Sequence, residues 1–105
     1  LVEPGPPAML TDKGIVLIYN SRNIKAKGDT SLANESYNVS QILMDKNSPF
    51  KVVARMDTAF LKADRLYEIN GQVHDVCFVE GLVNYKNKWF LYYGTADSKI
   101  AVAVK

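Results

Sequence analysis

Cysteine, histidine and tryptophan each occur once in this sequence of 105 residues, and the chain does not begin with methionine. The single thiol, Cys77, excludes an internal disulfide framework and a zinc site made of cysteines, and it leaves the redox compartment undecided. No apolar run reaches membrane-spanning length. Residues 1–4 lack the basic start and the apolar middle of a signal peptide. Because no initiator methionine is present, we expect a processed product or a fragment.

The chain also has little excess of one charge sign over the other. The formal net charge is +2, and the 13 Lys and Arg residues are scattered among 11 Asp and Glu residues. We therefore expect no basic patch of the kind that binds nucleic acid or a membrane surface. Apolar residues make up 48% and charged residues 23% of the chain, which is the balance of an ordinary globular domain with its own core.

Short β-strand patterns fill most of the chain. Runs rich in β-branched and aromatic residues are separated by turn signals, and Lys86-Asn87 marks a hairpin. Residues 20–34 are polar and without periodicity, which predicts a long loop, and residues 58–70 are expected to be irregular. The expected strands are residues 15–19, 37–45, 52–55, 73–79, 81–85, 88–93 and 100–104.

A faint internal repeat relates residues 14–20 to residues 88–94, and each copy is followed by a polar loop and another strand. Short strands in repeated groups are typical of β-propeller blades, which hold four strands each. A chain of this length would hold about two blades, and a closed ring needs more of them. The predicted fold class is all-β, and the pattern favours a fragment of a larger propeller.

Two carboxylates stand at the ends of aromatic-rich strands. Glu80 precedes Gly81, and Asp97 follows Gly94 and Ala96. A carboxylate beside aromatic side chains and glycine suits sugar binding or glycosidic chemistry. The residues alone leave other interpretations open, because Glu80 could be a solvated edge glutamate and Asp97 could stabilise a turn.

The order of several short motifs resembles the C-terminal part of glycoside hydrolase family 130. These motifs are Gly5-Pro6-Pro7, Leu17-Ile18-Tyr19, Pro49 with Val52 and Arg55, Tyr67-Glu68 with Gly71, Val76 with Phe78 and Gly81, and Tyr92-Tyr93-Gly94 with Ala96-Asp97. The resemblance implies a five-bladed β-propeller. Residues 1–105 would be roughly its last two blades, the C-terminal part of a single catalytic domain. It also implies β-mannoside substrates and a general acid upstream of this chain.

Two departures from the family's phosphorylases bear on the reaction. Asn20 stands where they carry a phosphate-binding histidine, and Glu80 supplies an acid that they usually lack. A carboxylate beside a phosphate would cost a few kcal/mol even at an effective dielectric of about 20. We therefore expect inverting hydrolysis of a β-mannoside, preferably β-1,2-linked. A phosphorylase that releases mannose 1-phosphate and a non-catalytic carbohydrate-binding β module remain alternatives.

The resemblance assigns roles to candidate site residues. An inverting glycosidase needs an acid and a base whose carboxyl groups lie about 6.5–9.5 Å apart. Glu80 is the first candidate for the base that activates water, and Glu35 is the second candidate or its partner. Asp97 would bind mannose hydroxyls, and Tyr37 and Phe78 would form the pocket wall.

Asn20 and the single histidine, His74, complete the predicted substrate-binding set. His74 has no companion pattern of metal ligands, so neither a metal nor another cofactor is expected. The expected partners are a mannose-containing oligosaccharide and the upstream blades, and homo-oligomer formation is left open. The resemblance implies the bacterial cytoplasm or periplasm as the location, and the residues do not decide between them.

Overall fold

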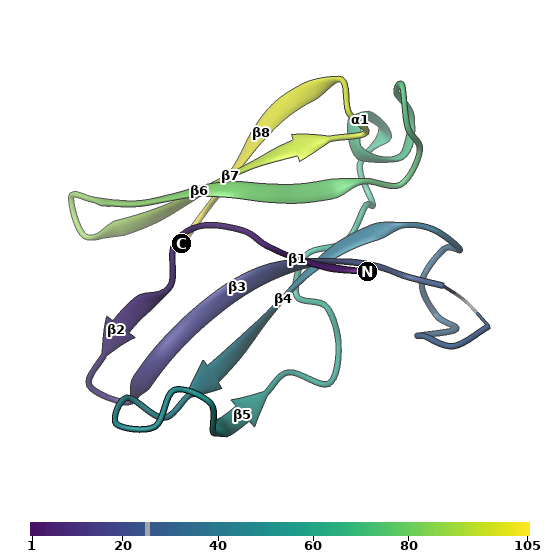
Figure 1. Ribbon diagram of the computed structural model, residues 1–105. Helices are drawn as coiled ribbons and strands as arrows, with labels where there is room; N and C mark the ends of the chain where they lie inside the picture. Colours follow the sequence, from purple (N-terminus) through teal and green to yellow (C-terminus); the bar gives the residue numbers. More distant parts are fainter. Residues whose placement is uncertain (25) are drawn as a thin grey trace.

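The computed structural model describes residues 1–24 and 26–105, and nearly all of its regular structure is β-sheet (Figure 1). The prediction of an all-β chain is confirmed. The elements in order are β1 (Val2–Pro4), β2 (Met9–Thr11), β3 (Gly14–Arg22), β4 (Tyr37–Met44), β5 (Val52–Arg55), α1 (Leu66–Ile69), β6 (Cys77–Tyr85), β7 (Lys88–Thr95) and β8 (Lys99–Val104).

The strands form two antiparallel sheets. The first sheet has the order β1-β3-β4-β5, and β2 pairs with β3 beside β1. The second sheet has the order β6-β7-β8. Figure 1 shows the second sheet, in green and yellow, lying over the first, in purple to teal. The two copies of the predicted repeat fall on β3 and β7, which are both inner strands of their sheets.

The core lies between the two sheets. Its buried members are Ile18 and Val39 from the first sheet, and Cys77, Val79, Leu91 and Tyr93 from the second. Leu82, Ala101 and Ala103 extend the contact from the second sheet. Alternation along the strands turns these side chains toward one face, as expected for sheets that pack face to face.

Several predicted elements differ from the observed ones. The expected loop of residues 20–34 begins later, because β3 continues to Arg22 while it pairs with β1 on one side and β4 on the other. Residues 58–70 include the helical turn α1. The strand expected at residues 73–79 begins only at Cys77, because Asp75 has a φ of 57°, which does not fit an extended chain.

Both hairpin turns of the second sheet use left-handed backbone. Lys86 and Asn87 have φ values of 49° and 62°, and Ala96 and Asp97 have values of 47° and 51°. Two successive residues with positive φ define the type I′ turn, whose twist matches that of the flanking strands. The predicted hairpin at Lys86-Asn87 is confirmed.

A β-bulge interrupts β6 in the middle. Val79 pairs with Tyr93 and Gly81 pairs with Tyr92, so Glu80 is an extra residue with no partner on β7. Bulges of this kind bend a strand and re-aim a side chain. The residues predicted as two strands, 73–79 and 81–85, therefore contribute to one bulged strand.

The outer face of the second sheet is apolar as well. The register places Val83, Phe90 and Val104 in one row and Tyr92 and Val102 in the next. All of them except the partly buried Phe90 are exposed. Antiparallel sheets usually bury one face and leave the other polar, so a second apolar face is unusual.

No helix in the described part of the chain is long and apolar enough to cross a membrane.

Candidate functional site

A pocket of about 310 Å³ opens where the first and second sheets meet. Its volume lies at the lower end of the range that accommodates small ligands. Four of the predicted site residues line it, and two valines from the segment between α1 and β6 complete it. The lining residues are Tyr37, Val73, Val76, Phe78, Glu80 and Asp97.

The aromatic wall joins the two sheets. The rings of Tyr37, at the start of β4, and Phe78, in β6, lie 5.9 Å apart between centroids with a tilt of 56°. The Tyr37 amide donates to the carbonyl of Asp75 at 3.0 Å, and Tyr37 forms a parallel bridge with Val76. These backbone contacts hold the ring of Tyr37 beside the second sheet, and the wall offers apolar surface to a sugar ring.

The two predicted carboxylates line the same pocket, although Glu80 lies in the middle of β6 and not at a strand end as expected. Glu80 is exposed in the β6 bulge, and Asp97 is exposed in the left-handed turn between β7 and β8. Neither takes part in the ion pairs found between described residues. Carboxylates without a cationic partner can accept hydrogen bonds from sugar hydroxyls or from a water molecule.

Glu35 lies apart from this pocket. Its carboxylate forms an ion pair with Arg22 at 2.6 Å on the exposed surface, and its backbone has a φ of 63°. The structure therefore does not bring Glu35 and Glu80 together around one cavity. A role for Glu35 as base or as partner stays a prediction.

Asn20 is fully buried and connects the two sheets. Its Oδ1 accepts from the Val79 amide at 2.7 Å, and its Nδ2 donates to the carbonyls of Val79 at 3.1 Å and Pro4 at 3.4 Å. The side chain thus replaces a strand partner between β3 and β6 and does not line the pocket. His74 is not among the lining residues either. Its ring is exposed, and its Nδ1 lies 3.1 Å from the carbonyl of Ile69.

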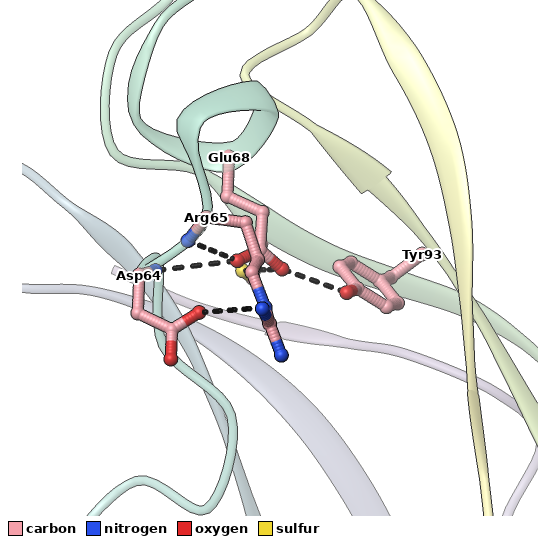
Figure 2. A network of polar contacts seen from close by, with 5 residues as sticks. Asp64, Arg65, Glu68 and Tyr93 are labelled. Atoms are coloured by element: carbon pink, nitrogen blue, oxygen red, sulfur yellow. Dashed lines mark hydrogen bonds and ion pairs between the residues drawn. The ribbon is translucent and has the colours of Figure 1, made fainter.

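Glu68 is a functional candidate that the sequence reasoning did not single out. It is the largest fully buried side chain, with 1% exposure, and four groups surround its carboxylate (Figure 2). Its Oε1 accepts from the amides of Asp64 and Arg65, and its Oε2 accepts from the Tyr93 hydroxyl and the Cys77 thiol. Glu68 accepts from the N-cap amide of Arg65 as the glutamate of a capping box does, but arginine has no acceptor atom, so the sequence lacks the Ser or Thr that would have signalled this position.

The hydrogen bonds decide the charge state of Glu68. Burial alone would raise the pKa of this carboxyl, but the hydrogen bonds from Tyr93 and from the backbone of Arg65 and Asp64 outweigh it and lower the pKa below its ordinary value. Burial, reinforced by the neighbouring carboxylate, raises the pKa values of the Cys77 thiol and the Tyr93 hydroxyl. The Asp64 side chain contributes to the same lowering of the pKa, so Glu68 is an anion held by several hydrogen bonds, with a second carboxyl nearby.

A second pocket of about 360 Å³ lies over the outer face of the first sheet. Its lining includes Ser21, Asn38 and Ser40, and none of the predicted site residues. The Ser40 hydroxyl is buried without a hydrogen-bond partner among the described residues. In the described part of the chain, no group of three or more His, Cys, Asp or Glu side chains could hold a metal ion.

Comparison with known proteins gives this site a context. The profile of glycoside hydrolase family 130, described as β-1,4-mannooligosaccharide phosphorylase, matches residues 1–105. A β-1,2-mannobiose phosphorylase of Thermoanaerobacter sp. (strain X514) is 36% identical over 100 residues, which cover 95% of this chain and 30% of that protein.

Solved structures agree with this match. A structure from Parabacteroides distasonis ATCC 8503 has a TM-score of 0.94 at 51% identity, covering 98% of this chain and 30% of that one. Another has a TM-score of 0.93 at 44% identity, covering 98% of this chain and 29% of the other. It comes from work stating that this family of mannoside phosphorylases contains glycoside hydrolases that target β-1,2 mannosidic linkages in Candida mannan. The chain spans about 30% of the length of the relatives it matches, and it belongs to glycoside hydrolase family 130.

Proposed function

We propose that this chain contributes the base and part of the mannose subsite to an enzyme that hydrolyses β-mannosides with inversion, preferably at β-1,2 linkages. One observation carries the proposal. The exposed carboxylate of Glu80, which has no cationic partner among the described residues, faces the same pocket as Asp97 and the Tyr37–Phe78 wall. A base, a sugar-binding carboxylate and an apolar wall around one cavity are part of what inverting glycoside hydrolysis needs.

The proposed mechanism divides the two carboxylates by role. Glu80 accepts a proton from a water molecule as that water attacks the anomeric carbon, so the carboxylate acts as general base. Asp97 accepts hydrogen bonds from mannose hydroxyls and fixes the ring in the pocket. The general acid, which protonates the leaving oxygen, comes from a part of the protein outside these residues.

Phosphorolysis is the second candidate, and the relatives support it. The family profile and the Thermoanaerobacter relative are both described as phosphorylases. Against it stands Glu80, because two negative charges about 4 Å apart repel by about 4 kcal/mol at an effective dielectric of 20. A phosphate in this pocket would meet that repulsion, whereas a water molecule would not.

We also propose that the two sheets are about two neighbouring blades of a β-propeller. The apolar outer face of the second sheet supports this proposal, as does the buried Ser40 hydroxyl, which has no hydrogen-bond partner among residues 1–24 and 26–105, because a further layer would cover both. The relatives are long enough to supply that layer from upstream residues, since this chain covers 30% of them.

The experiment uses the complete natural protein with β-1,2-mannobiose, with and without inorganic phosphate. Hydrolysis predicts mannose in both cases, released first as the α anomer, which proton nuclear magnetic resonance detects. The Glu80→Gln variant should lose about 10²–10⁴-fold in kcat. The control Asp12→Asn changes an exposed acid in a distant turn and should keep full activity. Dependence on phosphate, with mannose 1-phosphate as product, would overturn hydrolysis in favour of phosphorolysis.

A further inference from the structure

We propose that Glu68 is a positioning residue for the pocket, which it does not itself line. Its carboxylate fixes α1 to β6 and β7, and α1 in turn holds the connecting segment, residues 70–76, against the β7–β8 turn, residues 96–98. The connecting segment and the β7–β8 turn carry Val73, Val76 and Asp97, half of the pocket lining. The inference rests on the proposed function of that pocket.

The first link is the carboxylate itself. Its Oε1 accepts from the amides of Arg65 at 2.8 Å and Asp64 at 3.2 Å, which lie at the start of α1. Its Oε2 accepts from the Tyr93 hydroxyl at 2.7 Å and lies 3.6 Å from the Cys77 sulfur (Figure 2). No ion pair between described residues involves Glu68. Directional hydrogen bonds therefore hold this anion, and because the acceptor is charged they are shorter and stronger than bonds between neutral groups.

The second link runs through the backbone from α1 to the connecting segment. The Val76 amide donates to the carbonyl of Glu68 at 3.1 Å, and the Asp75 amide donates to the carbonyl of Ile69 at 3.1 Å. Glu68 thus holds β6 through its side chain at Cys77 and holds the residue before β6 through its own carbonyl. A shift of α1 would move Val76 directly.

The third link joins the connecting segment to the β7–β8 turn. The Val73 amide donates to the carbonyl of Ala96 at 3.1 Å, and the Ala96 amide donates to the carbonyl of Val76 at 3.0 Å. The Gln72 amide donates to the Ser98 hydroxyl at 2.8 Å. Asp97 lies between the two turn residues that make these bonds, so the connecting segment determines where its carboxylate stands.

Gly71 shows how closely these two segments fit. A Cβ atom at this position would lie 2.5 Å from the Ala96 carbonyl oxygen and 2.6 Å from the Ala96 Cβ. Such contacts force a backbone shift, because neither atom belongs to a flexible side chain. Gly71→Ala therefore displaces the β7–β8 turn without touching Glu68, and it provides an independent test of the third link.

The test compares variants of the complete natural protein. Glu68→Gln keeps the shape but puts an NH₂ group in place of one acceptor oxygen, so one donor of the set loses its partner. Tyr93→Phe removes one donor. Leu91→Val is the matched control, because Leu91 is a core residue two positions from Tyr93 and does not line the pocket. All variants are assayed on β-1,2-mannobiose at a temperature where each is folded.

We expect Glu68→Gln and Gly71→Ala to raise KM for the mannoside by about 10-fold or more, since displacement of a binding group by about 1 Å can cost 10²-fold. Leu91→Val should lower Tm and leave KM unchanged. Amide hydrogen exchange should accelerate at Val73 and Ala96 in Glu68→Gln and stay slow in Leu91→Val. Unchanged KM and unchanged exchange in Glu68→Gln would overturn the positioning role. An inactive wild-type protein would instead overturn the proposed function, and the exchange measurement would still test the positioning.

Discussion

Glu68 illustrates how a single residue can be anionic and buried at once. Its carboxylate is 1% exposed, yet its pKa is lowered, because donors from the backbone and from Tyr93 replace the water that it gives up. A buried carboxylate without these donors would have a raised pKa and would be protonated near neutral pH. The charge of Glu68 therefore depends on the folded arrangement around it.

The lowered pKa of Glu68 in the folded protein predicts how stability depends on pH. The folded pKa of Glu68 lies below its ordinary value of 4.5, so its stabilising contribution is complete above that pH and is lost as the pH falls through the folded pKa. We expect the difference in free energy of unfolding between wild type and Glu68→Gln to shrink between pH 7 and pH values below about 4. Urea denaturation at several pH values measures it. A difference that stays constant or grows on acidification would contradict the assignment.

The lowered pKa of Asp29 does not affect this difference between wild type and Glu68→Gln. Its pKa is also lowered, by hydrogen bonds from the hydroxyl and the amide of Ser31, but its carboxylate is unchanged in both proteins. Its contribution to the pH dependence is the same in each and cancels in the difference.

At the scale of elements, hairpin turns set the register of the second sheet. The turn at Lys86-Asn87 needs positive φ at both positions, which costs an L-residue about 1–2 kcal/mol and suits asparagine followed by glycine best. The chain has lysine and asparagine there, so the turn carries avoidable strain.

We expect the double variant Lys86→Asn with Asn87→Gly to raise the free energy of unfolding by about 1 kcal/mol. Thermal and urea denaturation measure the change. Asn84→Gly is the control, because the same type of exchange inside β6 should lower stability. Destabilisation by the turn variant would show that the left-handed geometry is not the limiting factor.

Much of this architecture could be predicted from sequence, because local patterns determine it. β5 occupies the residues expected for it, 52–55, and the hairpin forms at the dipeptide that signals it. α1 was missed because it is a single turn, and its buried Glu68 accepts a hydrogen bond from the Tyr93 hydroxyl, 25 positions away. The β6 bulge depends on the register against β7, which no local pattern shows.

In the candidate site, too, some residues could be predicted from the sequence and others only from the fold. The pattern of carboxylates beside aromatic strands pointed to Glu80 and Asp97, the family resemblance added Tyr37 and Phe78, and all four line one pocket. The two valines of the lining were missed, because a valine beside a cavity has the same sequence pattern as a valine in a core. Asn20 fits the polar character of a site residue, but its burial between the sheets could be recognised only with both sheets present.

At the scale of the whole molecule, two sheets give this chain one core and leave apolar surface outside. The rows Val83–Phe90–Val104 and Tyr92–Val102 form a continuous apolar face. Soluble proteins rarely expose a patch of this kind without a partner. In the proposed propeller, an upstream blade covers it.

The prediction concerns Val102 in the complete natural protein. Val102→Asp should lower the free energy of unfolding by about 3 kcal/mol or more, because it would place an unpaired charge in a buried interface. Thr30→Asp adds the same charge to an exposed loop position and should change stability little. Chemical denaturation compares the two. Equal, small effects would mean that the face remains in water and that no blade covers it.

The bulge at Glu80 has a consequence for how such an enzyme can change during evolution. Without the bulge, Glu80 would oppose Tyr92, Gly81 would oppose Leu91, and Leu82 would leave the core face. With it, the alternation of buried side chains continues past Glu80 as if that position did not exist. An exchange of the acid for another side chain therefore alters the chemistry of the pocket while the hydrophobic packing keeps its pattern. Under the proposed function, a change of nucleophile between water and phosphate at this one position would therefore not require rebuilding the sheet.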